Sequence, residues 1–118
     1  MSNLLSIAVI GAGRIGLVHA ENLAHRVRDA QLIAVTTSNP GQADKARRRC
    51  GDIAVFPTLE ALLAEGKINL EAVVIASSTS AHPDNVKTCA KAGLHIFCEK
   101  PLALSLSGCD KAIAAAEA

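Results

Sequence analysis

The sequence predicts an α/β fold: an open, doubly wound parallel sheet of about five strands with helices on both faces. Five apolar runs lack the polar alternation of a half-exposed strand, as expected for parallel strands that are buried on both sides. Segments with apolar residues at helical spacing separate these runs, and the connections are short. The length of 118 residues suits one domain with right-handed crossovers between its strands.

The five apolar runs are the predicted strands. In chain order they span residues 6–10, 32–35, 53–56, 72–76 and 95–98. The carboxyl ends of parallel strands meet at one edge of a sheet, and ligands of doubly wound sheets bind there. We therefore expect the polar segments after the first, second, fourth and fifth strands to lie close together.

Terminal signals predict where the first three helices begin and end. The first helix follows a glycine-rich turn, and Pro40 suits the first turn of a second helix over 42–50. Thr58 is the expected N-cap of the third helix, which ends near Gly66. The residues expected to face the core are Gly16, Ala20, Leu23, Ala24, Val27, Ala43, Ala46, Cys50, Leu59, Leu62 and Leu63.

The last two helices follow the fourth and fifth strands. His82-Pro83 begins the first of them, and Gly93 stops it. Ser107 and Asp110 have the spacing of a capping box and predict a final helix. The residues expected to face inward are Val86, Cys89, Ala90, Cys109, Ala112, Ile113 and Ala116.

The turn after the first strand carries a G-x-G-x-x-G motif. Gly11 permits the tight turn, Gly13 allows the backbone to approach a pyrophosphate, and Gly16 lets the helix pack closely on the strand. The pyrophosphate would lie on the N–H groups at the helix start, beside Arg14 and Ile15. A strand before and a helix after the motif favour dinucleotide binding over a turn whose glycines serve packing alone.

The end of the second strand departs from the usual dinucleotide pattern. An acidic residue normally stands about 20 positions after the glycines and binds the adenosine ribose. Thr37 and Ser38 occupy that place here. Their hydroxyls can donate to the 2′-phosphate of NADP, which a carboxylate would repel, although the arginine that usually follows this position is also missing. NADP or dual use is favoured over strict NAD. Residues 47–49 are three arginines one helix away, and we interpret them as a solvated face.

Further candidates follow the fourth and fifth strands. Ser77, Ser78 and Thr79 form a small polar loop, and His82 is either a cofactor-lining residue or a plain helix-entry residue. His19, one turn into the first helix, is expected to be structural.

The segment Glu99-Lys100-Pro101 ends the fifth strand. A lysine beside a carboxylate and before a proline suits positioning or proton transfer, because lysine shifts its pKa readily when desolvated. An ordinary surface strand terminus is the alternative, and physical argument alone does not reject it.

Composition narrows the class of protein. A net charge of +1 argues against nucleic acid or an anionic membrane as a partner, and no apolar run reaches the ~20 residues of a membrane span. The N-terminus does not resemble a signal peptide. The four cysteines lack metal-site spacing, so we expect buried free thiols, no metal, and a cytoplasmic protein.

Three parts of the sequence resemble the glucose–fructose oxidoreductase / inositol dehydrogenase / MocA family. These are IGAGRIGLVHA over 10–20, His82, and AGLHIFCEKPL over 92–102, in the family's order along nearly the whole chain. Within the family the sequence is most similar to the inositol 2-dehydrogenases. The resemblance implies a Rossmann domain that binds NAD or NADP, and hydride transfer between the nicotinamide and a secondary alcohol of a sugar or cyclitol.

The same resemblance implies roles for individual residues. Glu99 and Lys100 would border the nicotinamide and substrate, with Lys100 assisting the reacting hydroxyl, while residues 77–79 and His82 would line the cofactor. The family's main acid/base residues belong to a second domain. We therefore expect residues 1–118 to be an N-terminal fragment of a homo-oligomeric enzyme, inactive alone, without a sixth strand and with an exposed sheet edge. The alternatives are a stand-alone NAD(P)-binding regulatory module and an assembly role through that edge.

Overall fold

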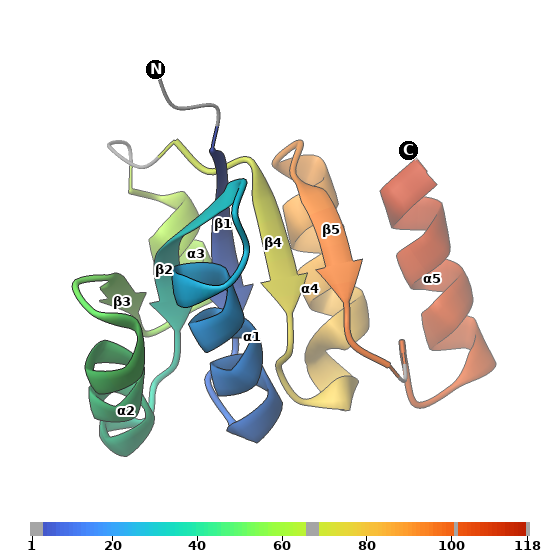
Figure 1. The fold of residues 1–118 in the computed structure, drawn as a ribbon. Helices are drawn as coiled ribbons and strands as arrows, with labels where there is room; N and C mark the ends of the chain where they lie inside the picture. The colour runs from blue at the N-terminus through green and yellow to red at the C-terminus, as the bar shows by residue number, and fades with distance from the viewer. Residues whose placement is uncertain (1–3, 66–68, 101, 118) are drawn as a thin grey trace.

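The computed structural model describes residues 4–65, 69–100 and 102–117, which form one five-stranded parallel sheet with helices on both faces (Figure 1). The strands are β1 (Leu5–Ile10), β2 (Ala30–Thr36), β3 (Ala54–Phe56), β4 (Ala72–Ile75) and β5 (His95–Cys98). The helices are α1 (Arg14–His25), α2 (Pro40–Cys50), α3 (Leu59–Leu63), the 3-10 turn η1 (Thr79–Ala81), α4 (His82–Lys91) and α5 (Leu106–Glu117). The predicted fold class is confirmed.

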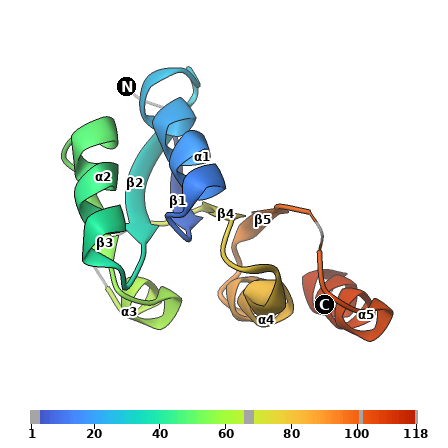
Figure 2. The same cartoon turned by 90° about the horizontal axis from the view of Figure 1, so that it is seen from below.

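The strand order is β3-β2-β1-β4-β5, and every pair is parallel. Helices α1 and α2 lie on one face, and α3, α4 and α5 lie on the other (Figure 2). The chain crosses from one face to the other after β3, so the strand order reverses between β1 and β4. Doubly wound sheets bind ligands at that switch point, outside the carboxyl ends of the strands.

The central strand β1 supplies the core on both faces because successive side chains of a strand point in opposite directions. Val9 packs with Leu17 and Val35 beneath α1 and α2. Ala8 and Ile10 pack on the other face, in a cluster that also contains Leu62, Val73, Ile75, Val86 and Cys89. Continuous apolar runs therefore predicted buried strands correctly for the centre of the sheet, but wrongly for β5, which is exposed on one face because it lies at the edge.

Strand β5 forms the edge of the sheet within the described part of the chain, as expected for a sheet without a sixth strand. Phe97 on this strand is 56% exposed. A shallow, mostly apolar depression, lined by residues 5, 7, 72–74 and 95–97, runs over β4 and β5. Within the same described ranges, no helix is long and apolar enough to cross a membrane.

Side-chain caps begin two of the helices, and the cap at Thr58 was predicted from the sequence. Asn39 Oδ1 accepts a hydrogen bond from the Gln42 amide at 3.0 Å, and Thr58 Oγ1 accepts one from the Ala61 amide at 3.0 Å. The expected end of α3 near Gly66 lies outside the described residues.

The start of α5 differs from the prediction. Ser105, not Ser107, caps this helix, because its Oγ accepts from the Gly108 amide at 3.1 Å. Ala112 is buried as expected, whereas Ile113 and Ala116 are exposed. The reason is that α5 packs against α4 and not on the sheet, so it buries a narrow stripe. Val27 is also exposed, since α1 has already ended at His25.

Two glycines fix how α1 leaves the sheet. Gly11 has φ +99°, and a Cβ at this position would lie 2.8 Å from the backbone of Ala76 and Ser77. A Cβ on Gly16 would overlap the carbonyl oxygen of Gly11, so α1 lies directly against the turn. Gly13 is different, because a Cβ there meets nothing within 4 Å and its backbone is extended.

We predict that Gly16→Ala lowers the free energy of unfolding by about 3 kcal/mol, because the overlap is with a backbone atom that cannot move aside. The ~1 kcal/mol that alanine gains in helix propensity is too small to offset this cost. Urea denaturation measures the change. Gly13→Ala is the matched control and should cost less than about 1 kcal/mol; equal stabilities for the two variants would contradict the packing argument.

Candidate functional site

A cleft of about 560 Å³ opens at the carboxyl edge of the sheet, at the switch point between β1 and β4. It is lined by residues 11–15, 36–38, 42, 76–79, 82, 99 and 100. Every residue proposed from the sequence as a site residue lines this cleft except Gly16, whose place is beneath the turn. Segments up to 89 positions apart along the chain thus line one continuous cleft, which is large enough for an extended ligand.

The start of α1 forms the base of the cleft. Gly13 is its N-cap, no side chain caps the helix, and its first turn carries no acidic residue. The first-turn N–H groups and the positive end of the helix dipole therefore favour an anion. The Gly11 amide donates to both the backbone oxygen of Thr36, at 3.1 Å, and Thr36 Oγ1, at 3.2 Å, which ties the glycine turn to β2.

The end of β2 forms a polar shelf beside the glycine turn. Thr37 Oγ1 donates to Gln42 Oε1 at 2.7 Å and accepts from the Asn39 amide at 3.1 Å. Ser38 is exposed next to it. Glu99 is the one acidic residue that lines the cleft in the described part of the chain, so this shelf presents hydroxyls and an amide where a ribose-binding carboxylate is usual.

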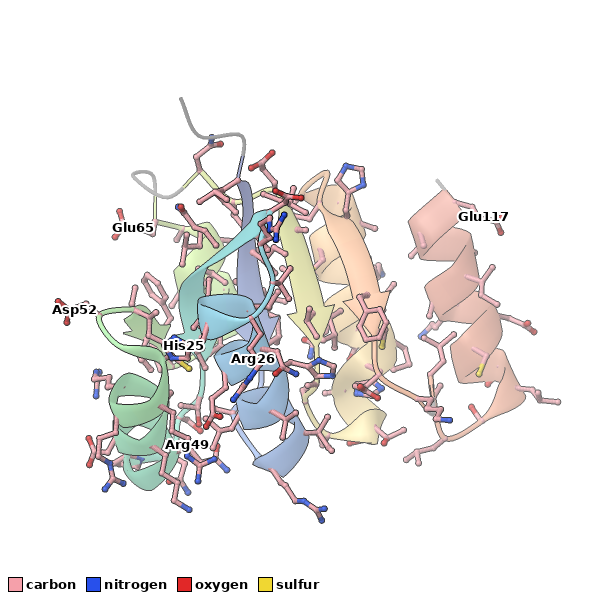
Figure 3. The ribbon with its side chains drawn as sticks, in the orientation of Figure 1. His25, Arg26, Arg49, Asp52, Glu65 and Glu117 are labelled. Atoms are coloured by element: carbon pink, nitrogen blue, oxygen red, sulfur yellow. The ribbon has the colours of Figure 1, made fainter. Side chains whose placement is uncertain are left out.

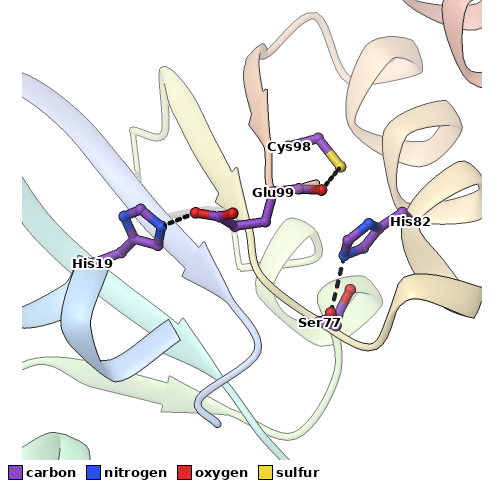
Figure 4. Close-up of polar contacts among 5 residues, drawn as sticks. All are labelled: His19, Ser77, His82, Cys98 and Glu99. Atoms are coloured by element: carbon purple, nitrogen blue, oxygen red, sulfur yellow. Dashed lines mark hydrogen bonds and ion pairs between the residues drawn. The ribbon is translucent and has the colours of Figure 1, made fainter. Parts of the chain in front are cut away.

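The loop after β4 is held in place by the first turns of α4. His82 is 2% exposed, and its Nε2 donates to the backbone oxygen of Ser77 at 2.9 Å (Figure 4). Asn85 Nδ2 donates to Ser77 Oγ at 2.8 Å. His82 thus lies at the floor of the cleft and fixes Ser77. Sequence reasoning missed Asn85, although its spacing of three from His82 on one helix places both side chains on the same face.

A hydrogen bond between side chains joins the two sides of the cleft. His19 Nε2 on α1 lies 2.6 Å from Glu99 Oε1, directly after β5, and both side chains are 27% exposed (Figure 4). The His19 ring also meets Phe97 edge to face, with centroids 5.8 Å apart. His19 therefore has the structural role that the sequence suggested, but its partner belongs to the cleft itself.

The environment of Glu99 keeps it ionised. The hydrogen bond from His19 holds the pKa of the Glu99 carboxyl below its usual range; burial acts in the opposite direction. The charge of His19, and the amide and charge of Lys100, add to the lowering. Because an ionised carboxylate only accepts hydrogen bonds, His19 is the donor.

Lys100 directly follows Glu99, whose position is fixed by hydrogen bonds. The Glu99 amide donates to the backbone oxygen of Ile75 at 2.9 Å, so both the main chain and the side chain of Glu99 are held. Lys100 is exposed and lines the cleft. The third member of the predicted segment, Pro101, lies outside the described residues.

The cysteines contribute no reactive group to this site. All four are free, and Cys50 and Cys89 are buried as expected. Burial raises the pKa of Cys89 to about 12 and also raises the pKa of Cys50 and Cys98, so these thiols stay protonated at neutral pH. Across the ranges that the structure describes, no three His, Cys, Asp or Glu side chains gather as metal ligands would.

Known proteins resemble this chain in both sequence and fold. A family model described as "Oxidoreductase family, NAD-binding Rossmann fold" matches residues 5–118. The chain is 38% identical over 109 residues to the myo-inositol 2-dehydrogenase of Thermotoga maritima, which covers 92% of this chain and 32% of that protein. It is 37% identical over 106 residues to the scyllo-inositol 2-dehydrogenase (NAD(+)) of Bacillus subtilis, covering 90% of this chain and 30% of that protein.

Solved structures give the same result. The apo scyllo-inositol dehydrogenase of Lactobacillus casei superposes with a TM-score of 0.88 and 28% identity, over 98% of this chain and 34% of that one. The same enzyme with bound NAD(H) and scyllo-inositol gives 0.86 and 28%, over 95% and 32%. This chain therefore spans about a third of the length of the proteins that it matches.

We predict that His19→Ala raises the pKa of Glu99 toward its usual range, because it removes the hydrogen-bond donor that is the largest cause of the lowering. An NMR titration of labelled glutamate carboxyls measures the change. Since the carboxyl pKa is lower in the folded state, ionised Glu99 stabilises the fold at neutral pH, and this contribution is lost as the pH falls through the folded-state pKa.

The control is His25→Ala on the same helix, where the ring bonds to the Arg49 backbone oxygen at 2.6 Å and not to Glu99. This variant should leave the Glu99 titration unchanged. An unaltered Glu99 pKa in His19→Ala would show that the hydrogen bond between His19 and Glu99 does not form in solution.

Proposed function

This chain belongs to the oxidoreductase family with an NAD-binding Rossmann fold, and from that premise we propose that it is the NAD(P)-binding domain of a dehydrogenase. One observation carries the proposal. The glycine turn, the ends of β2 and β4, and the Glu99-Lys100 segment line a single cleft at the switch point of the sheet. In this proposal Gly11, Gly13, Arg14, Ile15, Thr37, Ser38, Ser77, Ser78, Thr79, His82 and Glu99 bind the cofactor, and Gly16 permits the turn.

The proposed binding mode follows from the chemistry of the walls. The pyrophosphate lies on the amides at the start of α1, where Gly13 leaves space for close approach. The adenosine ribose lies on the hydroxyls of Thr37 and Ser38. The nicotinamide end then extends toward the loop over 77–79 and toward Lys100, on the side of the cleft formed by β4 and β5.

The proposed reaction is the reversible oxidation of a secondary alcohol. The bound nicotinamide supplies a hydride acceptor for the carbinol C–H. The hydroxyl must lose its proton at the same time, so a general base is required. Lys100 is the proposed catalytic residue of this chain: its ammonium group would lie near the reacting oxygen, orient the hydroxyl and assist the proton transfer to that base.

The rest of the enzyme is proposed from the lengths of the relatives. Because this chain spans about a third of them, we propose that residues 1–118 form the nucleotide-binding domain of a longer protein. A second domain would bind the substrate and supply the main acid and base. The names of the relatives support a cyclitol such as an inositol, or a related sugar, as the substrate. We further propose that the full-length enzyme is a homo-oligomer. We also propose that it is cytoplasmic, because free cysteines are typical of reducing compartments.

The cofactor is either NAD or NADP. Relatives are named for NAD(+) or were solved with NAD(H). In this chain, however, the ribose shelf has the hydroxyls of Thr37 and Ser38 and no carboxylate to repel a 2′-phosphate. We therefore propose that the protein uses NADP or accepts both cofactors.

Gly13→Ala tests cofactor binding separately from folding. The new methyl group meets no atom of the protein within 4 Å, but it stands where the pyrophosphate would approach the backbone. We expect NADH and NADPH affinities to fall by about tenfold or more at unchanged stability, measured by nicotinamide fluorescence. If the wild-type chain binds neither cofactor at millimolar concentration, the dinucleotide proposal is wrong.

Lys100→Ala tests the catalytic role in a version of the protein that includes the second domain. We expect kcat to fall by about 10²-fold or more, with cofactor affinity changed by less than about threefold. Lys87→Ala, an exposed lysine on α4 that does not line the cleft, is the control. Unchanged turnover in Lys100→Ala would mean that Lys100 is structural.

A further inference from the structure

A second, smaller cleft of about 240 Å³ lies between α1 and α2, next to the candidate cofactor cleft. It is lined by residues 12–14, 17, 18, 42, 45 and 49. Four of these, Ala12, Gly13, Arg14 and Gln42, also line the larger cleft. The two clefts therefore meet at the glycine turn and at the first turn of α2.

Three cationic side chains line this second cleft: Arg14 from α1, and Lys45 and Arg49 from α2. None of its lining residues is acidic. Arg49 Nε lies 3.4 Å from Glu21 Oε1 on α1, which offsets one charge and leaves an excess of positive charge at Arg14 and Lys45. At the start of α1 the helix dipole adds to that potential.

The orientation of α2 explains why these residues converge. Gln42, Lys45 and Arg49 are spaced by three and four, so they form one stripe along the helix. The contact of His25 Nε2 with the Arg49 backbone oxygen, at 2.6 Å, and the Arg49–Glu21 pair turn that stripe toward α1 (Figure 3). Arg49 is exposed, as the sequence predicted, but it also pairs with Glu21 on α1.

The neighbouring arginines do not share this position. Arg47 pairs along the helix with Asp44, at 3.7 Å, and neither Arg47 nor Arg48 lines the cleft. Both are exposed, as the sequence suggested. The positive charge of α2 is thus divided between a face toward α1 and a face toward solvent, and the two faces can be tested against each other.

Gln42 connects this charge to the ribose shelf. Its Oε1 accepts from Thr37 Oγ1 at 2.7 Å, so it stands between the place proposed for the adenosine ribose and the second cleft. A group attached to the ribose 2′-oxygen and directed toward α2 would pass Gln42 and meet Arg14 and Lys45. Arginine and lysine are the side chains that bind phosphate, by paired hydrogen bonds and as a point charge respectively.

We propose that the cleft between α1 and α2 is a phosphomonoester site that binds the 2′-phosphate of NADP, with Arg14 and Lys45 as its main cations. The site makes NADP a better ligand than NAD. This inference rests on the proposed dinucleotide function and adds the residues that distinguish the two cofactors. Arg14 lines both clefts, whereas Lys45 and Arg49 line the second cleft alone, so Lys45 is the cation that distinguishes a 2′-phosphate from the pyrophosphate.

Lys45→Glu tests the site in the 118-residue chain. We expect NADPH to bind about tenfold or more weakly, because a carboxylate replaces a cation beside the 2′-phosphate, while NADH affinity changes by less than about threefold. Arg48→Glu is the matched control: it makes the same charge change on the same helix, outside the cleft. It should reduce NADPH and NADH binding equally and by less than about threefold.

The outcomes are distinct. If the wild-type chain binds neither cofactor, the proposed function fails and this site fails with it. If the wild type binds both cofactors and Lys45→Glu lowers both affinities equally, the assignment to the 2′-phosphate is overturned while the dinucleotide site stands. The same holds if Arg48→Glu lowers the NADPH affinity as much as Lys45→Glu does. Inorganic phosphate added to the wild type should weaken NADPH binding more than NADH binding at matched ionic strength; equal effects would overturn the assignment as well.

Discussion

The close approach of α1 to the turn that precedes it is the constraint on which this domain depends. With no side chain at Gly11 or Gly16, the helix lies against the Gly11 carbonyl, and the turn lies against the backbone that leaves β4. That packing brings the start of α1 to the switch point of the sheet. The start of α1 has no side-chain cap, and because it lines the cleft its free N–H groups face the place where a ligand would bind.

The opposite walls of the cleft are held by hydrogen bonds and not by packing. His82 and Asn85 both form hydrogen bonds with Ser77. His19, on the helix that follows β1, forms a hydrogen bond with Glu99, which follows β5. These bonds connect four elements and fix polar groups before a ligand arrives. Such preorganisation reduces the entropic cost of binding and orients reacting groups. The hydrogen bond between His19 and Glu99 also connects the end of the edge strand β5 to α1, in addition to the pairing of β5 with β4.

Much of the fold could be predicted from local sequence because its determinants are local. Apolar runs without alternation identified all five strands, and Pro40 and Thr58 identified two helix starts. Errors arose where tertiary packing decides. Ser105 and Ser107 stand two residues apart at the start of α5, and only the observed helix start at Leu106 shows which of them is the cap. The inward face of α5 was assigned too widely, since the prediction assumed packing on the sheet and the helix packs on α4.

The candidate site was predictable where topology alone brings residues together, at the carboxyl ends of the strands. Its internal contacts were not. His19 and Glu99 are 80 residues apart, and no local pattern indicates that they meet. The stripe formed by Lys45 and Arg49 is visible in the sequence as helical spacing, but its direction depends on how α2 packs against α1. Gln42 was missed because its role depends on the hydroxyl of Thr37.

The central claim is that one cleft, formed by segments from across the chain, binds a dinucleotide. Its most direct test is a map of backbone amide chemical shifts in the 15N-labelled chain during titration with NADH. The account predicts that saturable shifts concentrate in residues 11–15, 36–38, 76–79, 99 and 100, on both sides of the cleft together. Shifts confined to the uncovered face of β4 and β5, around Val74 and Phe97, or no saturable shifts at all, would contradict it.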